Sequence, residues 1–237
     1  MKSPAWILPV TLVALLLGYL IVAASKQSAE SPMARYYPGA DSRSAVSGIA
    51  QSIDEKDAEI SKLREEVTRM QNALADQSRQ AQVLNESLQE VKLLAGLTEV
   101  QGPGVEIILR DSTKQADDPW QYVIHDLDVL RVVNELWLSG AEAISVNKQR
   151  IAIGSAFRCE GPVIYVGRVP ISSPVTIRAI GDPDTLFGAL NMPGRYIADI
   201  RQVDPSMVEI RKKTEIVLPA YTGSTDFRHA KSTQPKR

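Results

Sequence analysis

The residues most suited to metal chemistry in this chain lie close together, at positions 125–128. His125, Asp126 and Asp128 combine one imidazole with two carboxylates, a set of side chains able to hold a metal ion. The same residues at the start of a helix would cap its free N–H groups and complement its dipole. We favour the capping interpretation and predict no metal site and no cofactor.

Four further polar residues form our candidate binding surface: Asn134, Glu135, Asn147 and Arg150. Asn134 and Glu135 fall within a predicted helix, whereas Asn147 and Arg150 flank a predicted hairpin turn at 148–149. An Asn beside a turn also satisfies hairpin geometry by itself, so a structural role for Asn147 is the alternative.

Cys159 is the single cysteine, which rules out an intrachain disulfide and a cysteine-based zinc site. No second histidine lies near it in the sequence, so we predict a small buried residue rather than a nucleophile. The sequence has no P-loop, Rossmann fingerprint, nucleophile elbow or metalloprotease helix. We therefore predict no catalytic residues and no enzymatic activity. The formal net charge of -1 also gives no reason to expect nucleic acid.

The first element that must position these residues is an apolar segment near the amino terminus. Residues 5–24 carry no charge between Lys2 and Lys26, and about 20 apolar residues suffice to cross a bilayer. A cleaved signal peptide is the alternative, although its apolar region is usually about 7–15 residues long. We predict a retained single-pass anchor over 1–25, with the amino terminus cytoplasmic and the body extracytoplasmic.

A linker and a long helix are expected next. Residues 26–45 are rich in Ser, Ala, Pro and Gly and predict a flexible linker. Residues 46–96 follow a seven-residue repeat without proline, which predicts a continuous helix of about 50 residues. Its a positions are Val46, Ile53, Ile60, Val67, Leu74, Ala81, Leu88 and Ala95, and its d positions are Ile49, Lys56, Leu63, Met70, Gln77, Leu84 and Val91.

The repeat favours a parallel homodimeric coiled coil, which would form a stalk. Three alternatives stay open: a higher oligomer, pairing with a related chain, and a long amphipathic helix packed on its own domain.

The body over 97–221 alternates short β-rich segments with two helical ones. Strands are expected near 105–109, 143–146, 150–157, 163–169, 175–180 and 207–211, with helices from about Asp126 and from about Pro183. This order predicts an α+β fold of the ferredoxin-like, split βαβ type, with two helices on one face of an antiparallel sheet and an extra hairpin strand. The tail 222–237 is basic and is expected to be disordered.

Several segments of the body resemble a bacterial family known as domain of unknown function (DUF) 881: Val123 to Asp128, Val133 to Trp137, Gly140 to Asn147, Gln149 to Ile151, Arg158 to Gly161 and Ala179 to Gly181. The resemblance spans roughly 88–211 and includes the layout of anchor and coil. It implies an envelope-facing membrane protein of Gram-positive or related bacteria, often encoded near cell-division genes. No catalytic activity comes with it.

These features together predict a non-enzymatic, membrane-anchored scaffold or interaction protein of the cell envelope, linked to cell division or wall synthesis. Its expected partners are the membrane, a second copy bound through the coiled coil, and other envelope or division proteins. The alternative is an extracytoplasmic ligand-binding or sensor module.

Overall fold

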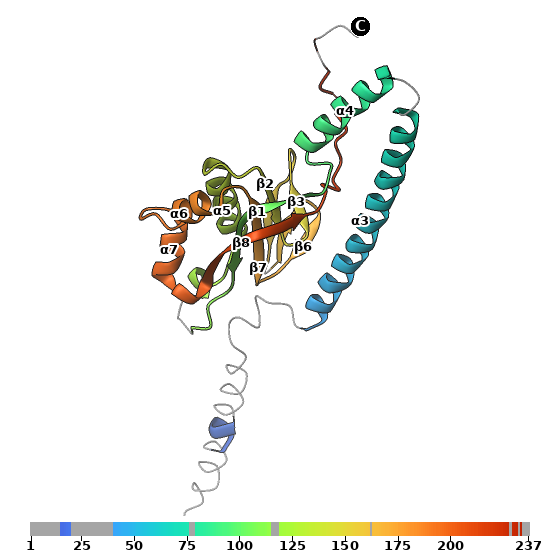
Figure 1. The fold of residues 1–237 in the computed structure, drawn as a ribbon. Coiled ribbons are helices and arrows are strands. Elements are labelled where there is room, and N and C mark those ends of the chain that lie inside the picture. The colour runs from blue at the N-terminus through green and yellow to red at the C-terminus, as the bar shows by residue number, and fades with distance from the viewer. Residues whose placement is uncertain are drawn as a thin grey trace, which may run out of the picture. The chain divides into compact units, whose positions relative to one another are not determined.

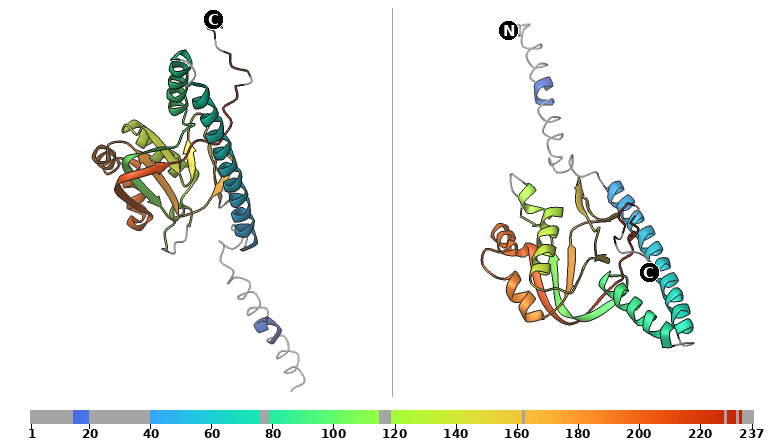
Figure 2. Two further views of the ribbon diagram at one scale, coloured as in Figure 1. Left: turned by 45° about the vertical axis from the view of Figure 1, so that its right-hand side comes forward. Right: turned by 90° about the horizontal axis from the view of Figure 1, so that it is seen from above.

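The computed structural model describes residues 15–19, 40–75, 79–114, 119–161, 163–227, 229–231 and 233 (Figures 1 and 2). The chain divides into two units, Met1–Ala45 and Val46–Arg237. The contacts reported below lie within the second unit.

The body is built on a five-stranded antiparallel sheet with the strand order β3-β2-β7-β1-β8. Strand β1 (Val100–Leu109) lies between β7 (Val175–Ile180) and β8 (Val208–Leu218). Strand β7 also pairs with β2 (Ala143–Val146), which turns into the edge strand β3 (Gln149–Ile151). Every pairing is antiparallel, so one sheet joins segments from both ends of the body.

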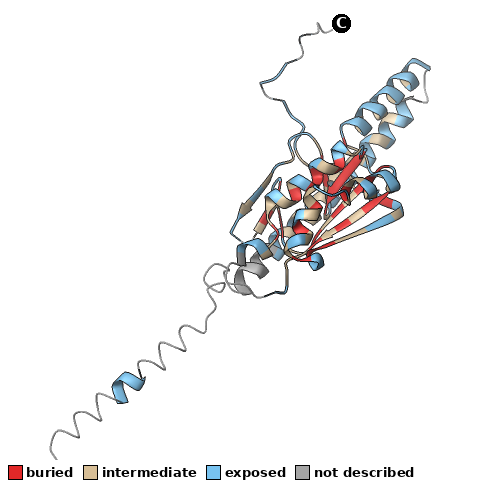
Figure 3. Ribbon diagram, turned by 90° about the vertical axis from the view of Figure 1, so that its left-hand side faces the viewer, coloured by how far each residue is buried: buried red, intermediate tan, exposed pale blue. Residues whose placement is uncertain are grey.

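Three helices cover one face of this sheet (Figures 1 and 3): α5 (Asp126–Leu138), α6 (Pro183–Leu190) and α7 (Tyr196–Val203). Side chains alternate between the two faces of a strand, so every second residue of β1 points to these helices. The core between sheet and helices is fully buried and includes Val105, Ile107, Leu109, Val129, Val132, Leu136, Leu186, Leu190 and Ile197.

A second, three-stranded sheet follows β3, with the order β4 (Phe157–Glu160), β5 (Val163–Val166), β6 (Val169–Ile171). The prediction of single strands over 150–157 and 163–169 is therefore wrong. Positive φ angles of 91° at Gly154 and 63° at Gly167 turn the chain within those stretches. Short 3-10 turns, η1 (Pro119–Tyr122) and η2 (Pro205–Met207), precede α5 and β8.

The prediction of a mixed α+β body with antiparallel strands is confirmed. The prediction of two helices on the sheet is wrong, because the second predicted helix is followed by a third. Helix α6 ends at Leu190, Gly194 adopts a φ of 78°, and the chain enters α7 at Tyr196. Asn191 caps α6, and the positive φ of Gly194 turns the chain just before α7 begins.

The predicted continuous helix over 46–96 is also wrong, because the region contains α3 (Ala40–Ala75) and α4 (Arg79–Leu94). Asn85 Nδ2 donates to Asn72 Oδ1 at 2.7 Å, and Lys92 Nζ donates to Gln71 Oε1 at 2.8 Å. In one straight helix these pairs would lie about 20 and 32 Å apart along the axis. The two helices therefore lie side by side as an antiparallel pair, the α3–α4 hairpin (Figure 2). The d position Gln77 lies outside the described residues.

The remaining predicted segments are only partly described. Residues 15–19 of the predicted anchor are helical, and its other residues lie outside the described part of the chain. No helix among the described residues combines the length and the apolar character needed to span a bilayer. The predicted linker is helical over 40–45, within α3, and its residues 26–39 lie outside the description. The described residues of the predicted tail form neither helix nor strand.

Candidate functional site

The four predicted binding residues have different surroundings. Asn134 is exposed on α5, while Glu135 accepts a hydrogen bond from the Tyr196 backbone N–H at 2.9 Å and joins α5 to α7. Asn147 has a φ of 52°, and its Oδ1 accepts from the Thr176 N–H at 2.9 Å. Asn147 thus shapes the β2–β3 turn, which is the structural alternative foreseen for it.

Arg150 lies on the face of the sheet opposite α5. It is paired with Ser145 across β3 and β2, Ser145 is paired with Arg178, and Arg178 with Glu106 on β1. Cross-strand neighbours share a face, and Glu106 alternates with the β1 residues that pack under the helices. The four predicted residues therefore do not form one binding surface.

Arg150 is a buried cation without a carboxylate partner among the described residues. Its side chain is only 6% exposed, and its Nη1 donates to the backbone oxygens of Thr98 and Pro219, at 3.2 Å each. Burial lowers the pKa of the Arg150 guanidinium from its ordinary value, because a charged group is poorly solvated there. An arginine remains protonated all the same, so a positive charge persists in this position.

Arg150 lines a cavity of about 770 Å³, which we call the Arg150 groove. Its other walls come from the carboxyl end of α4, the start of β1, the end of α5 and the β2–β3 edge. Glu142 also lines the groove, and its apolar lining residues are Leu93, Leu94, Val100, Trp137, Ala143, Ile151, Ala152, Ile153 and Ile180. A cavity of this size and composition is typical of small-molecule sites.

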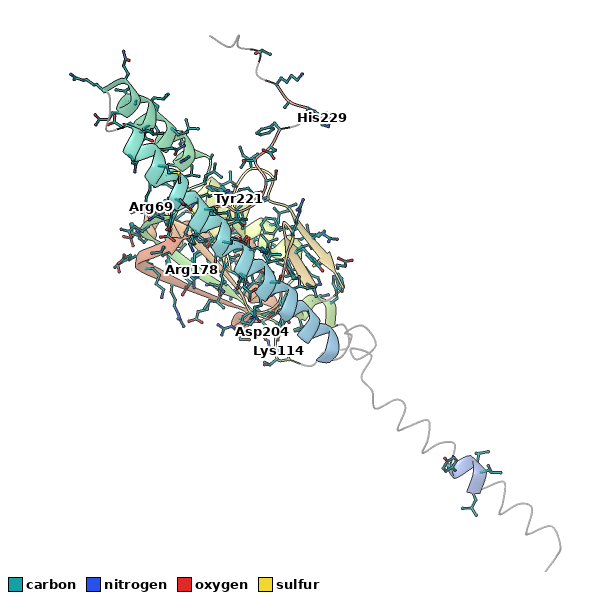
Figure 4. All side chains as sticks on the ribbon, turned by 90° about the vertical axis from the view of Figure 1, so that its right-hand side faces the viewer. Arg69, Lys114, Arg178, Asp204, Tyr221 and His229 are labelled. Atoms are coloured by element: carbon teal, nitrogen blue, oxygen red, sulfur yellow. The ribbon has the colours of Figure 1, made fainter. Side chains whose placement is uncertain are left out.

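The same sheet face carries a second charged cluster, which is fully paired. Arg178 Nε donates to Glu106 Oε2 at 2.8 Å, and Lys213 Nζ lies 3.4 Å from Glu106 Oε1 (Figure 4 labels Arg178). Burial alone would raise the pKa of Glu106, but the hydrogen bond and charge of Arg178, with Lys213, lower it overall. These residues therefore form a salt-bridge network that needs no ligand to balance its charge.

The residues at the start of α5 have the capping arrangement favoured by the sequence. The Asp128 carboxylate accepts from the His125 backbone N–H at 2.6 Å, and the Asp126 carboxylate accepts from the Cys159 N–H at 3.0 Å. Burial raises the pKa of the Cys159 thiol, which disfavours the reactive thiolate. No metal-binding group of three His, Cys, Asp or Glu side chains occurs in the described part of the chain.

A smaller cavity of about 260 Å³ lies beside this helix start, between η1 and α7. The Trp120 and His125 rings stack with centroids 4.2 Å apart, and Tyr196 donates its hydroxyl to Asp128. Burial, followed by the hydrogen bond to Asp128, raises the pKa of Tyr196 to about 12. Tyr196 therefore stays protonated at neutral pH and acts as a hydrogen-bond donor that fixes α7 against α5.

Sequence reasoning identified Arg150 but missed the apolar walls of its groove. The sequence predicts Ile153 within a strand over 150–157, whereas it lies exposed after the end of β3. No local pattern predicts that the end of α4 lies beside it. The groove exists only because segments distant in sequence meet at one sheet edge.

The comparisons with known proteins place the chain in a class. Residues 87–231 match the sequence profile of the family described as "Bacterial protein of unknown function (DUF881)", so the chain belongs to this family and the predicted resemblance is confirmed. The matched region includes the last part of α4, the α/β body and every residue that lines the Arg150 groove.

Its relatives include proteins of Bacillus subtilis and Mycobacterium tuberculosis. The UPF0749 protein YlxW of Bacillus subtilis is 36% identical over 135 residues, which are 56% of this chain and 58% of YlxW. The UPF0749 protein Rv1823 of Mycobacterium tuberculosis is 34% identical over 174 residues, which are 68% of this chain and 56% of that protein. The chain thus matches less than two thirds of the length of these relatives.

One solved structure is similar as well. The crystal structure of an uncharacterized conserved protein from Mycobacterium tuberculosis aligns with a TM-score of 0.50 and 25% sequence identity. The alignment covers 62% of this chain and 99% of that chain. The α/β architecture is therefore shared with a protein that has been solved.

Proposed function

We propose that this protein is a non-enzymatic, membrane-anchored scaffold of the bacterial cell envelope that associates with a second copy of itself. The observation that carries the proposal is an apolar stripe on α3, the outer α3 face, which comprises Ile49, Leu63, Val67, Met70 and Leu74. These side chains are between 50% (Val67) and 64% (Leu74) exposed. At about 100° per residue they fall within roughly 60° of one another around the helix.

The α3–α4 hairpin does not cover this stripe, because its five side chains remain at least half exposed. The side-chain hydrogen bonds between the two helices come from another side of α3. They link Asn72 to Asn85, and Lys92 to Gln71 and Thr68. An exposed apolar surface that recurs along a helix is typical of a protein interface. Burying it against an identical helix would stabilise the assembly by about 25 cal/mol per Å² of apolar surface.

The proposal also includes the membrane location of the protein and the fold class of its body. Residues 1–25 anchor the chain, the amino terminus is cytoplasmic, and the body outside the cell presents itself to other envelope or division proteins. The uncharged stretch 5–24 supports the anchor. We also propose a split βαβ, ferredoxin-like classification for the body, supported by the order β8-β1-β7-β2 with α5 and α6 as crossovers.

Disulfide cross-linking of the full chain in membranes tests the self-association. In a Cys159→Ser background, Leu63→Cys and Met70→Cys should form linked dimers on mild oxidation, because facing positions of paired helices bring their Cβ atoms close enough. The control Glu65→Cys is two residues from Leu63, about 200° away around the helix, and should cross-link at least fivefold less. Equal cross-linking at all three positions would contradict the proposal.

A second candidate function, an extracytoplasmic ligand-binding or sensor module, is favoured by the Arg150 groove. A buried and unpaired guanidinium in a largely apolar cavity of about 770 Å³ is an arrangement that a bound anion would complete. Ligand binding and self-association use different surfaces and are compatible with one another.

A further inference from the structure

We propose that the Arg150 groove binds a small amphiphile, an apolar chain that ends in a single carboxylate. The inference rests on the second candidate function, ligand binding, and is independent of self-association through the outer α3 face. In this arrangement the Arg150 guanidinium holds the carboxylate, and the apolar walls of the groove hold the chain.

The charge of Arg150 is the first argument. Only Nη1 of its guanidinium has acceptors among the described residues, the Thr98 and Pro219 oxygens, which leaves the N–H groups of Nη2 and Nε free to donate. By contrast, Arg178 on the same face has its carboxylate partner Glu106 at 2.8 Å. A buried charge without a counter-ion is costly, and the planar guanidinium fork matches a carboxylate in two parallel hydrogen bonds.

A second buried polar group lies beside Arg150. Ser145 is only 1% exposed, and its hydroxyl has no hydrogen-bond partner among the described residues. It is the cross-strand neighbour of Arg150, so both side chains are on the same face of the sheet. Ser145 is not among the residues that line the groove, so Arg150 is the group that would contact a polar head group directly.

The walls of the groove select the rest of the ligand. Leu93 and Leu94 at the end of α4, Trp137 at the end of α5, and Ile153 after β3 are all large apolar residues that remain exposed, with Ile153 at 86%. An apolar chain that covers them would gain free energy from burial. Glu142 also lines the groove, and its carboxylate would repel a second negative charge on the ligand, so a single carboxylate fits best.

A purely structural role for Arg150 makes a different prediction. Its two backbone hydrogen bonds tie the segments before β1 and after β8 to β3. If Arg150 only joined these segments, the substitution Arg150→Gln would lower thermal stability. It would not change the ratio of the affinities for a charged and an uncharged ligand. The ratio of the affinities for the charged and the uncharged ligand therefore distinguishes a structural role of Arg150 from a ligand-binding role.

The test uses the full chain in lipid nanodiscs, with empty nanodiscs as the background, and isothermal titration with hexanoate, hexanol and acetate. Wild type should bind hexanoate at least tenfold more tightly than hexanol or acetate. Arg150→Gln should weaken hexanoate binding at least tenfold and leave hexanol binding unchanged. The matched control Arg178→Gln, on the same face, should leave hexanoate binding unchanged.

A second variant keeps the test decisive if Arg150→Gln fails to fold. Ile153→Glu alters an exposed groove residue and should weaken hexanoate binding at least fivefold by repulsion and loss of apolar contact. Equal affinities for hexanoate and hexanol, or no effect of either variant, would overturn the proposal. An acetylated apolar tripeptide that binds tenfold more tightly than hexanoate would assign the groove to a peptide carboxyl terminus instead. Cross-linking at Leu63→Cys, measured in parallel, reports separately on the scaffold.

Discussion

The α3–α4 hairpin and the α/β body differ in how far their apolar side chains are buried. In the body, Ile107, Leu136 and Ile177 are fully buried between sheet and helices, whereas Leu63, Met70 and Leu74 on α3 are more than half exposed. Figure 3 shows this contrast as a red interior beside largely pale blue helices. The body is stabilised by contacts within the chain, and the hairpin presents apolar surface that another molecule can cover.

The largest expected effect comes from a cavity in the body. Ile107→Ala should lower the free energy of unfolding by about 2–5 kcal/mol, because a buried isoleucine leaves a void when truncated. Leu63→Ala on the outer α3 face is the matched control and, at protein concentrations too low for self-association, should change it by less than about 0.5 kcal/mol. Urea denaturation followed by circular dichroism measures both. Similar losses for the two variants would show that the hairpin is as tightly packed as the body.

A close approach of two strands gives the next effect. A Cβ added at Gly104 on β1 would lie 1.9 Å from the Ala179 backbone oxygen on β7, so the strands would have to separate. Gly104→Ala should therefore destabilise the body by roughly 1–3 kcal/mol. Gly188→Ala in α6 has open space around its Cβ and should stabilise the protein by about 0.5–1 kcal/mol. Thermal unfolding of the two variants tests whether Gly104→Ala lowers the stability and Gly188→Ala raises it.

Acid stability should depend on Asp204, which lies beside Lys114 (Figure 4). Hydrogen bonds from the Ser112 hydroxyl and the Ser206 N–H lower the pKa of Asp204 from 3.8 to about 2. Because the folded-state pKa is the lower one, this carboxylate stabilises the fold above about pH 4 and loses that effect as the pH falls toward 2. Asp204→Asn should lower the melting temperature at pH 7 and flatten its decline below pH 4. The exposed Asp199→Asn serves as a control and should alter neither.

The smallest effect is expected where the hairpin touches the body. Lys148 at the β2–β3 turn lies 2.6 Å from Asp54 on α3, and both side chains are well exposed. Exposed ion pairs contribute at most about 1 kcal/mol, so Asp54→Asn should barely change global unfolding. Hydrogen exchange in α3 should nevertheless become faster, while exchange in β1 stays unchanged. An equal change in β1 would show that the two regions unfold together.

Several features of the body could be predicted from local sequence. The strands β2 and β7 matched their predicted bounds, and α5 began at Asp126 with its carboxylates in the first turn. These segments have the short apolar runs or the 3.6-residue periodicity that local propensity follows. Where glycines turn the chain, at Gly154 and Gly167, the predicted strand boundaries failed, because a turn can split what reads as one apolar run.

The candidate site shows the same limit. The sequence shows only that Arg150 is polar and charged. The structure adds that its guanidinium is buried with no carboxylate beside it, because the segments around Thr98 and Pro219 cover it. Asn134 and Glu135 were predicted to share a polar binding surface with it, but α5 carries them to the other side of the sheet. Polarity is a local property, whereas desolvation depends on which distant segments cover a side chain.

The sequence by itself determined the family, the antiparallel α+β body and the apolar stripe along α3, because each follows from residue type and short-range periodicity. Only the tertiary structure decided that α3 and α4 fold against each other, that 157–171 form a separate sheet, and that Arg150 lines a groove. The heptad pattern gives the spacing of apolar residues along a helix but not the position where the helix breaks, so it cannot choose between a continuous stalk and a hairpin. That choice depends on contacts between residues far apart in the chain, such as Asn72 with Asn85.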